Sequence, residues 1–322
     1  DSSCGRFETR TVIAGGRLTL CLLVSRRCNL RCGFCAVEFS DRDMPWKTAR
    51  AAVERYLERN PGAVAPRVKF FGGEPLLNWE VIRRTIEAGR SRWKGAGLRF
   101  DLPTNGLMLD NEKRQFLCAH PEVEVTLSSF APRGVVPPGT WFTVMLDRRG
   151  GGRAMVRRLR RLLAEGYRHF NFLPVYFVPW TEMEIASLRE SLAAAAGIIA
   201  GLWHRGVPVR VKNMEVWSPV PLYNEAVTVD TDGSVYGSNL IQIRGMERFR
   251  NQLFLGHIEG PAWGFETRRP QGEMLQELLR DGAGPELWRI TLEVDANLSS
   301  FVADLARRRS VAEETACAGG AR

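Results

Sequence analysis

The sequence has few of the residues that common metal sites and disulfide frameworks need. Only four histidines occur among the 322 residues, and no cysteine lies between Cys118 and Cys317. The histidines are scattered without a ligand-like pairing, which disfavours the Cys/His knuckles of zinc fingers. An odd total of seven cysteines in a chain of this length also disfavours the disulfide framework of a small secreted domain.

Long apolar runs are absent as well. No run approaches the roughly 18–20 residues that a bilayer-spanning helix needs, and the longest candidate, at 193–203, predicts a buried helix. Residues 1–4 lack the charged-then-apolar order of an export signal. We therefore expect a cytoplasmic protein without a membrane partner. The 44% of hydrophobic and 25% of charged residues are typical of a globular chain.

The net charge of +9 comes mainly from arginine, as in the run at 157–161. Around this run Val156, Leu159 and Leu163 recur at helical spacing, which is typical of an amphipathic helix with a solvated charged face. This interpretation is favoured over attraction of an acidic partner such as an acidic peptide or nucleic acid. No helix-turn-helix, RNP or zinc-finger pattern accompanies the charge, so we expect no nucleic-acid partner.

Three cysteines, Cys28, Cys32 and Cys35, lie close together directly after an apolar run at 18–24 that predicts a buried strand. Thiolates at this spacing can hold one face of a cubane iron–sulfur cluster. No fourth cysteine is near in sequence, so one iron would stay open to an exogenous ligand. A structural zinc site with a distant fourth ligand is the alternative, and the spacing favours the iron–sulfur site.

Strands and helices are expected to alternate from residue 18 to residue 204, because runs of apolar residues alternate with helical periodicity. This repeat, with six strands, predicts an α/β fold with a parallel sheet, a partial (β/α)6 TIM-like barrel. The segment at 128–139 is too short and rich in proline for a crossover helix, so either a turn replaces that helix or its two strands are not parallel neighbours. The expected strands are at 18–24, 67–71, 98–102, 123–127, 141–146 and 169–177, and the expected helices at 46–59, 79–93, 110–118, 153–165 and 181–204.

The pattern changes after about residue 206. A strand at 209–212, a β-hairpin at 226–236 with an Asp-Gly turn, and helices at 271–280 and 285–308 predict a small C-terminal β-hairpin and helical extension. The expected organisation is an N-terminal segment at 1–16, a core domain at 17–206, an extension at 207–311 and a disordered tail at 312–322.

Two short motifs follow successive predicted strands. Gly72-Gly73-Glu74-Pro75 comes after the second strand, and Thr104-Asn105-Gly106 after the third. Alone, the glycine pair predicts a tight turn and Asn-Gly a hairpin-type turn. In parallel α/β barrels, however, the loops at the carboxyl ends of the strands form the active site. The order of these two motifs after the three cysteines therefore indicates a functional site. The glycines of such a site allow close approach of the backbone to a ligand.

Cys28-x3-Cys32-x2-Cys35, with Phe34 before the third cysteine, resembles the signature of the radical S-adenosylmethionine (radical SAM) superfamily. Gly72-Gly73-Glu74-Pro75 matches the GGEP motif of that family, and the stretch at 70–78 is similar to its peptide-modifying branch. The resemblance covers residues 17–205. It extends more weakly to 226–260, which looks like a SPASM/twitch extension.

This resemblance implies a reaction and its cofactors. The three cysteines would hold one 4Fe–4S cluster, whose open iron binds S-adenosylmethionine. One electron from a reductant such as flavodoxin or ferredoxin would then yield a 5′-deoxyadenosyl radical that abstracts hydrogen from substrate. No catalytic residue is assigned. The implied binding residues are Phe34 near the adenine, Gly72, Gly73, Glu74 and Pro75 at the methionine ammonium, and Thr104 and Asn105 near the ribose.

The sequence also departs from the family pattern. SPASM members carry further cysteines for auxiliary clusters, whereas residues 236–239 read Tyr-Gly-Ser-Asn after the hairpin. We therefore expect a single cluster and a degenerate extension. The usual Asp-Gly after the fourth strand is replaced by Ser-Ser-Phe at 128–130. Cys118 is expected in the core and Cys317 in the tail, so neither is assigned as a hydrogen donor, and Cys4 and Cys21 form no ligand group with them.

The leading substrate is a ribosomal peptide, because of the similarity at 70–78, so the chain would be a peptide maturase. About 16 residues precede the first strand, and we expect a separate leader-peptide-binding protein to recognise such a peptide. One alternative is a radical SAM enzyme acting on a small-molecule metabolite. The other is a non-catalytic iron–sulfur accessory protein, favoured by the degenerate extension and the missing Asp-Gly. The type of reaction, from cross-linking to epimerisation, stays open.

Overall fold

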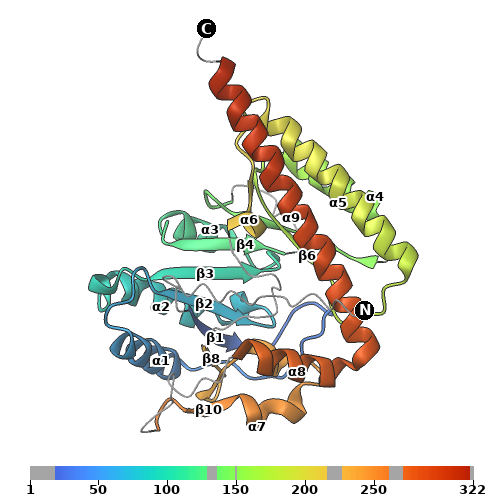
Figure 1. The fold of residues 1–322 in the computed structure, drawn as a ribbon. Coiled ribbons are helices and arrows are strands. Elements are labelled where there is room, and N and C mark those ends of the chain that lie inside the picture. Colours follow the sequence, from blue (N-terminus) through green and yellow to red (C-terminus); the bar gives the residue numbers. More distant parts are fainter. Residues whose placement is uncertain (1–18, 129–135, 149–150, 216–226, 261–270, 320–322) are drawn as a thin grey trace.

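The computed structural model describes residues 19–128, 136–148, 151–215, 227–260 and 271–319 (Figure 1). The expected N-terminal segment at 1–16 with Cys4, and positions 129 and 130 of the Ser-Ser-Phe motif, lie outside the described residues, as does the side chain of Cys317.

Within this part of the chain, ten strands form one sheet in the order β10-β9-β8-β1-β2-β3-β4-β5-β6-β7. Strands β1 to β7 pair in parallel in chain order, and β7 and β10 are the two edges, so the barrel is not closed. The strands are β1 (Thr19–Ser25), β2 (Arg67–Gly72), β3 (Arg99–Thr104), β4 (Val123–Leu127), β5 (Trp141–Leu146), β6 (His169–Pro174), β7 (Arg210–Val211), β8 (Val227–Val229), β9 (Ser234–Tyr236) and β10 (Phe254–His257).

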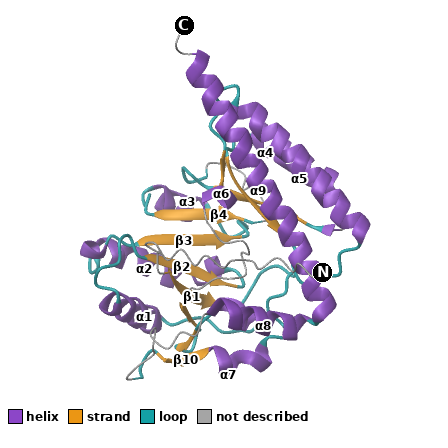
Figure 2. Ribbon diagram, viewed as in Figure 1, coloured by secondary structure: helices purple, strands orange, loops and turns teal. Residues whose placement is uncertain are grey.

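Helices cover the outside of this sheet (Figure 2). Figures 1 and 2 show α1 and α2 beside the first strands, while α9 runs alongside α5 next to β6. The α-helices are α1 (Trp46–Arg59), α2 (Trp79–Arg90), α3 (Asn111–Cys118), α4 (Gly151–Ala164), α5 (Glu182–Trp203), α6 (Lys212–Glu215), α7 (Arg250–Leu253), α8 (Gln271–Ala283) and α9 (Pro285–Gly319). Short 3-10 turns include η1 (Pro75–Asn78) and η4 (Asn239–Gln242).

The apolar pattern explains why these segments form these elements. In β1 every residue after Thr19 is buried, as expected for a central strand of a parallel sheet that is covered on both faces. In α1 the apolar stripe of Ala49, Ala52, Val53 and Tyr56 is fully buried in the core. The helix α5 begins with a capping box, in which the Thr181 hydroxyl accepts from the Glu184 amide and the Glu184 carboxylate accepts from the Thr181 amide.

The predicted α/β fold with a parallel sheet is confirmed. From β1 to α5 the observed strands and helices begin and end within a few residues of the predicted ones. The open question at 128–139 is answered by pairing: β4 and β5 are parallel neighbours, with Thr126 opposite Trp141 and Leu127 opposite Phe142. The hairpin of the extension continues the core sheet, because β8 pairs in parallel with β1, Leu20 lying opposite Val227.

Two expectations are corrected. The prediction of a disordered tail from residue 312 is wrong for residues 312–319, because α9 continues to Gly319 and Ala312 is buried. Between Pro285 and Gly319 the helix contains no other proline or glycine, and residues such as alanine and glutamate favour helix.

The second correction concerns apolar length. Among the described residues, α5 is the one helix that is long and apolar enough to cross a membrane by length and composition alone, although the sequence was expected to hold none. Its apolar window is 44% buried, and it packs on α4 and α9, which is typical of a core helix in a globular domain.

Candidate active site

Three loops meet at the carboxyl ends of β1, β2 and β3: the cysteine loop (residues 26–38), the GGEP loop (72–75) and the TNG loop (104–106). Backbone bonds join the first two, because the Gly73 amide donates to the Ser25 carbonyl at 2.9 Å and the Glu74 amide to the Arg27 carbonyl at 2.8 Å. The three motifs that the sequence singled out are therefore brought together at one edge of the sheet, where parallel α/β folds place their active sites.

The two glycines of the GGEP loop are needed for contact within the chain. A Cβ on Gly72, which has φ of +135°, would lie 1.9 Å from the Ser25 carbonyl oxygen. A Cβ on Gly73 would lie 2.2 Å from the Arg27 carbonyl oxygen and 3.0 Å from Cβ of Cys28. The sequence predicted that these glycines let the backbone approach a ligand. Their observed neighbours within the chain are the last residue of β1 and the first residues of the cysteine loop.

The Glu74 carboxylate is buried, with 1% of the residue exposed, and bonds to donors of its own chain. One oxygen accepts from the Leu76 amide at 3.0 Å and from the Thr104 hydroxyl at 2.7 Å. The other accepts from the Asn105 amide at 2.8 Å. Burial raises the pKa of Glu74 above its ordinary value, and these three bonds offset part of the shift. Glu74 thus ties the GGEP loop to the TNG loop.

Asn105 extends this network to the cysteine loop. Its Nδ2 donates to Oδ1 of Asn29 at 2.8 Å, and its own Oδ1 accepts from the Leu107 amide at 2.9 Å. Asn78 is the last residue of the stretch at 70–78 that resembles the peptide-modifying branch. Its side-chain amide donates to the Val24 and Met44 carbonyls and so anchors the end of β1. Sequence reasoning missed Asn29. Its place directly after the first cysteine was the only signal.

The three cysteines of the loop are free and half-buried. The Leu30 amide donates to Sγ of Cys28 at 3.4 Å, and the Cys35 amide donates to the Cys32 carbonyl at 3.0 Å. Burial is the main cause that raises the pKa of Cys28 and Cys32, and the neighbouring thiols add to it. Because ligand thiols must be deprotonated, metal binding here would release protons.

This donor set fits an iron–sulfur cluster. Within the described residues, no three Cys, His, Asp or Glu side chains are close enough to bind a single metal ion, and this includes the three cysteines of the loop. A cubane cluster is larger than one ion, so its thiolate ligands lie farther apart than those of zinc. Three free thiols on one partly exposed loop match the ligand type of such clusters.

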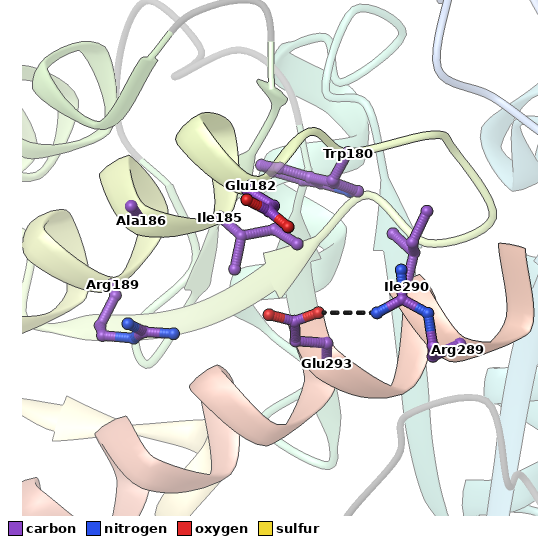
Figure 3. A pocket seen from close by; sticks show the side chains of 8 residues that line it. All are labelled: Trp180, Glu182, Ile185, Ala186, Arg189, Arg289, Ile290 and Glu293. Carbon is purple, nitrogen blue, oxygen red and sulfur yellow. Dashed lines mark hydrogen bonds and ion pairs between the residues drawn. The ribbon is translucent and has the colours of Figure 1, made fainter. Parts of the chain in front are cut away.

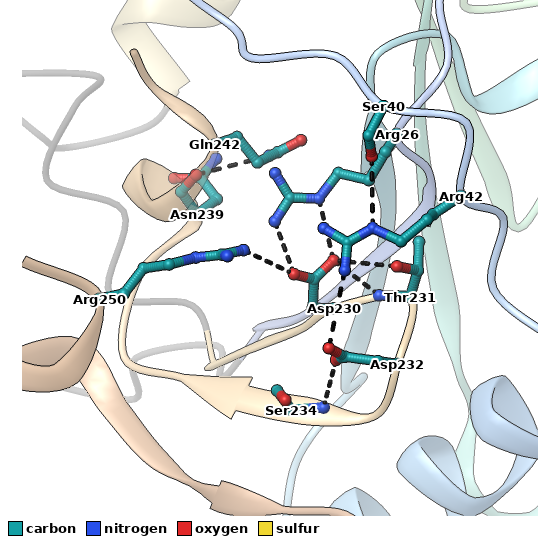
Figure 4. Close-up of polar contacts among 10 residues, drawn as sticks. All are labelled: Arg26, Ser40, Arg42, Asp230, Thr231, Asp232, Ser234, Asn239, Gln242 and Arg250. Atoms are coloured by element: carbon teal, nitrogen blue, oxygen red, sulfur yellow. Dashed lines mark hydrogen bonds and ion pairs between the residues drawn. The ribbon is translucent and has the colours of Figure 1, made fainter. Parts of the chain in front are cut away.

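A buried ion network begins at Arg26, the first residue of the cysteine loop (Figure 4). Arg26 is 2% exposed and binds Asp230 in a bidentate pair, with N–O distances of 2.9 and 2.6 Å. Arg250 approaches the same carboxylate from the other side at 3.0 Å. Burial alone would raise the pKa of Asp230, but the hydrogen bond and charge of Arg26 hold it below its ordinary value. The network joins the start of the cysteine loop to the C-terminal extension.

Other predicted residues lie as follows. Phe34 is half-buried against the main core, and Pro75 is buried as the first residue of η1. Cys118 is exposed, so its expected place in the core is wrong. In α3 the only buried residue is Leu117, and the next position along a helix points about 100° away from that face.

A cavity of about 390 Å³ opens elsewhere, between α5 and α9 (Figure 3). Glu182 and Arg189 line it from α5, beside Trp180, and Arg289 and Glu293 line it from α9. Arg289 pairs with Glu293, and Arg189 donates to Asn297. None of the lining residues belongs to the three motif loops, so this cavity is separate from the candidate site.

Comparisons with known proteins place the chain in a family. The sequence model of the radical SAM superfamily matches residues 22–192. The chain is similar to an uncharacterised protein of Methanocaldococcus jannaschii, 33% identical over 99 residues that make up 30% of this chain and 33% of that protein. It is also similar to a probable dual-specificity RNA methyltransferase RlmN of Gemmatimonas aurantiaca, 32% identical over 83 residues, 25% of this chain and 23% of that protein. The chain thus matches a third or less of the length of either relative.

Two solved structures share the fold. The chain is similar to anSMEcpe with bound AdoMet at a TM-score of 0.69 and 16% identity, over 92% of this chain and 99% of that one. It is similar to SuiB of Streptococcus suis bound to the precursor peptide SuiA at a TM-score of 0.55 and 14% identity, over 80% and 66%. At these identities the likeness is one of fold. Because the family match covers more than half of its residues, the chain belongs to the radical SAM superfamily of enzymes.

Proposed function

We propose that this chain reductively cleaves S-adenosylmethionine and uses the resulting radical to abstract hydrogen from a substrate. The observation that carries the proposal is that hydrogen bonds of Glu74 and its neighbours join the three motif loops at one edge of the sheet. When bound, the cluster and S-adenosylmethionine supply the radical chemistry. The chain supplies the ligands and the binding surface.

The proposed cluster ligands are Cys28, Cys32 and Cys35. A single 4Fe–4S cluster is proposed because the sequence from 119 to 316 holds no cysteine. The core domain at 17–206 would provide the site, and the extension at 207–311 would support it from the β8 side of the sheet. An external one-electron reductant such as flavodoxin or ferredoxin is needed, which favours the cytoplasm as the location.

For S-adenosylmethionine, we propose contacts from the same loops. The GGEP loop would present its backbone to the methionine ammonium, since the Glu74 carboxylate is already bonded to three donors of the chain. Its neighbours Gly72, Gly73 and Pro75 would shape this surface. Thr104 and Asn105 are proposed near the ribose, and Phe34 near the adenine.

The proposed substrate is a peptide. The fold is shared with an anSMEcpe structure that contains a peptide called Cp18Cys and with the SuiB structure that contains its precursor peptide SuiA. The similarity at 70–78 to the peptide-modifying branch points the same way. A separate leader-peptide-binding protein remains part of this proposal.

The test is the release of 5′-deoxyadenosine. Anaerobically reconstituted, reduced protein should produce it from S-adenosylmethionine, and the Cys28→Ala variant should produce none. Cys118→Ala, which removes an exposed cysteine away from the loops, is the matched control and should match wild type. Iron analysis should give about four atoms per chain. Failure of wild type to release 5′-deoxyadenosine contradicts the enzymatic proposal, and about eight or more iron atoms contradict the single cluster.

A further inference from the structure

We propose that residues 242–244 of the C-terminal extension position the exit of the cysteine loop, and that Arg244 is the positioning residue for Cys35. This inference rests on the proposed function only in that Cys35 would hold the cluster. The contact itself is a property of the chain.

The pairing of the two segments resembles a short antiparallel ladder. Val37 and Ile243 form an isolated antiparallel bridge. On either side of it, the Glu38 amide donates to the Gln242 carbonyl at 2.6 Å, and the Arg244 amide donates to the Ala36 carbonyl at 2.9 Å. The extension therefore fixes the backbone of the three residues that follow Cys35.

Arg244 adds a side-chain contact to the ligand residue itself. Its guanidinium donates to the backbone carbonyl of Cys35. Bonds from a charged donor are stronger than neutral ones and fix geometry more tightly. Groups that orient a metal ligand in this way commonly change metal affinity 10–100-fold when they are removed.

The segment that carries Arg244 is itself firmly held. The turn η4 before it is capped by the Ser238 hydroxyl, which accepts from the Leu240 amide at 3.2 Å. Leu240 and Ile241 pack in a second core cluster with Cys21 and Leu23 of β1. Because β8 is bonded to β1 as well, the extension is anchored on the same strand that leads into the cysteine loop.

The cysteine loop is thus fixed at successive points along its length. Its entry is held by the GGEP loop through Arg27, and its first turn by Asn105 through Asn29. Its exit is held by residues 242–244. With its two ends fixed by different parts of the chain, the spacing of the outer cysteines depends on the extension as well as on the core.

Arg244 also brings a positive charge beside a cluster ligand. Reduction adds a negative charge to an iron–sulfur cluster, so a nearby cation favours the reduced form. Arg244 is exposed, and water screens part of this effect. We expect loss of the charge to lower the ratio of reduced to oxidised cluster at a fixed potential by up to about tenfold, which is about 59 mV for one electron.

The experiment uses Arg244→Gln, with Arg248→Gln as the matched control. Arg248 is an exposed arginine on the same extension, and its guanidinium bonds to the Asp281 carbonyl, away from the cysteine loop. In the cluster-free chain, the rate of Cys35 alkylation is followed by mass spectrometry, with Cys28 as the internal standard. Loss of a nearby positive charge by itself disfavours the reactive thiolate and slows alkylation. Several-fold faster alkylation of Cys35 in Arg244→Gln, with Cys28 unchanged, is therefore the result expected if loosening of the loop exit dominates.

The second readout is the potential of the reconstituted cluster, followed by its electron paramagnetic resonance signal. Arg244→Gln should lower it, whereas Arg244→Lys should restore most of it. Unchanged alkylation and potential in Arg244→Gln would overturn the inference, as would equal changes in Arg248→Gln. If wild type releases no 5′-deoxyadenosine while Arg244→Gln still exposes Cys35, the proposed function fails and the positioning role stands.

Discussion

Glu74 brings a carboxylate into a place from which water is almost excluded, and the chain compensates it with a hydroxyl and two amides. Those donors come from the 3-10 turn that follows Glu74 and from the neighbouring TNG loop. Both carboxylate oxygens are used as acceptors. A side chain that also donates cannot replace this arrangement without leaving a buried donor unpaired.

Replacing Glu74 by glutamine tests this requirement. The amide nitrogen of Glu74→Gln would face a donor, so we expect a loss of about 1–2 kcal/mol in the free energy of unfolding, part of the cost being offset by removal of a buried charge. Urea unfolding at neutral pH measures it. Glu80→Gln is the control, because Glu80 lies exposed on α2 and pairs with Arg83, a contact worth less than about 1 kcal/mol. Equal losses in both variants would show that Glu74 does not hold the loops together.

The cysteine loop shows what a sequence reveals about single residues. Cys28, Cys32 and Cys35 were predicted as ligands from their spacing, and the GGEP and TNG loops as binding loops from their place after predicted strands, because these signals are local. The partners that hold them are not local. Asn29 bonds to Asn105 across 76 positions, and no pattern within either segment predicts that contact.

At the scale of elements, local periodicity predicted α1 at its observed bounds, and predicted β4 and β5 equally well. The pairing of the strands was harder to predict. The segment between β4 and β5 lacks the pattern of a crossover helix, so the sequence did not show whether these two strands pair in parallel or in which register. The end of α9 was also missed. A tail of small residues was expected to be disordered, whereas those residues continue a helix whose preceding turns are already packed.

The contact between α9 and the segment after β6 contains a buried titratable pair. The Tyr176 hydroxyl donates to Asp295 of α9 at 2.8 Å, and the Thr291 hydroxyl accepts from the Phe177 amide at 3.2 Å. Burial raises the pKa of Asp295 to about 6 from its ordinary value of 3.8, and the bond from Tyr176 only partly offsets it. Docking of α9 therefore favours the protonated carboxyl.

This pair predicts a pH dependence of stability. Between about pH 4 and pH 6 the folded chain keeps a proton that the unfolded chain has lost, so the contribution of Asp295 is fully present below about pH 4 and is lost as the pH rises through about 6. In Asp295→Asn the amide oxygen can still accept from Tyr176 but no longer titrates. When the pH rises from 4 to 7, the free energy of unfolding of wild type should therefore fall by about 2 kcal/mol relative to that of Asp295→Asn.

Urea unfolding at several pH values measures this shift. Tyr176→Phe is a second variant: without the hydroxyl, the buried carboxylate loses its donor, and the loss of stability should extend to higher pH. Parallel pH profiles for wild type and Asp295→Asn would show that Asp295 is not the group responsible.

At the scale of the whole molecule, the extension is continuous with the core. Strand β8 lies beside β1, and the pair of Arg26 and Asp230 joins residues 204 positions apart. The sequence predicted the hairpin and its Asp-Gly turn, but it could not show that Asp230, which precedes that turn, would be buried against Arg26, the first residue of the cysteine loop. Long-range charge pairs of this kind depend on the completed fold.

A double-mutant cycle on this pair tests whether the extension and the core are energetically coupled. Asp230→Leu leaves Arg26 buried without its counter-charge and should cost about 3–5 kcal/mol. Arg26→Met should cost less, because Arg250 still lies 3.0 Å from the carboxylate of Asp230. The double variant should be more stable than the sum of the single losses predicts, since neither charge is then left unpaired by its partner.

Urea unfolding gives the three free energies, and the exposed pair of Glu80 and Arg83 gives the reference coupling, below about 1 kcal/mol. Additive losses for Arg26 and Asp230 would mean that the extension is attached through its strands alone, and the coupling would then have to be sought in the pairing of β8 with β1.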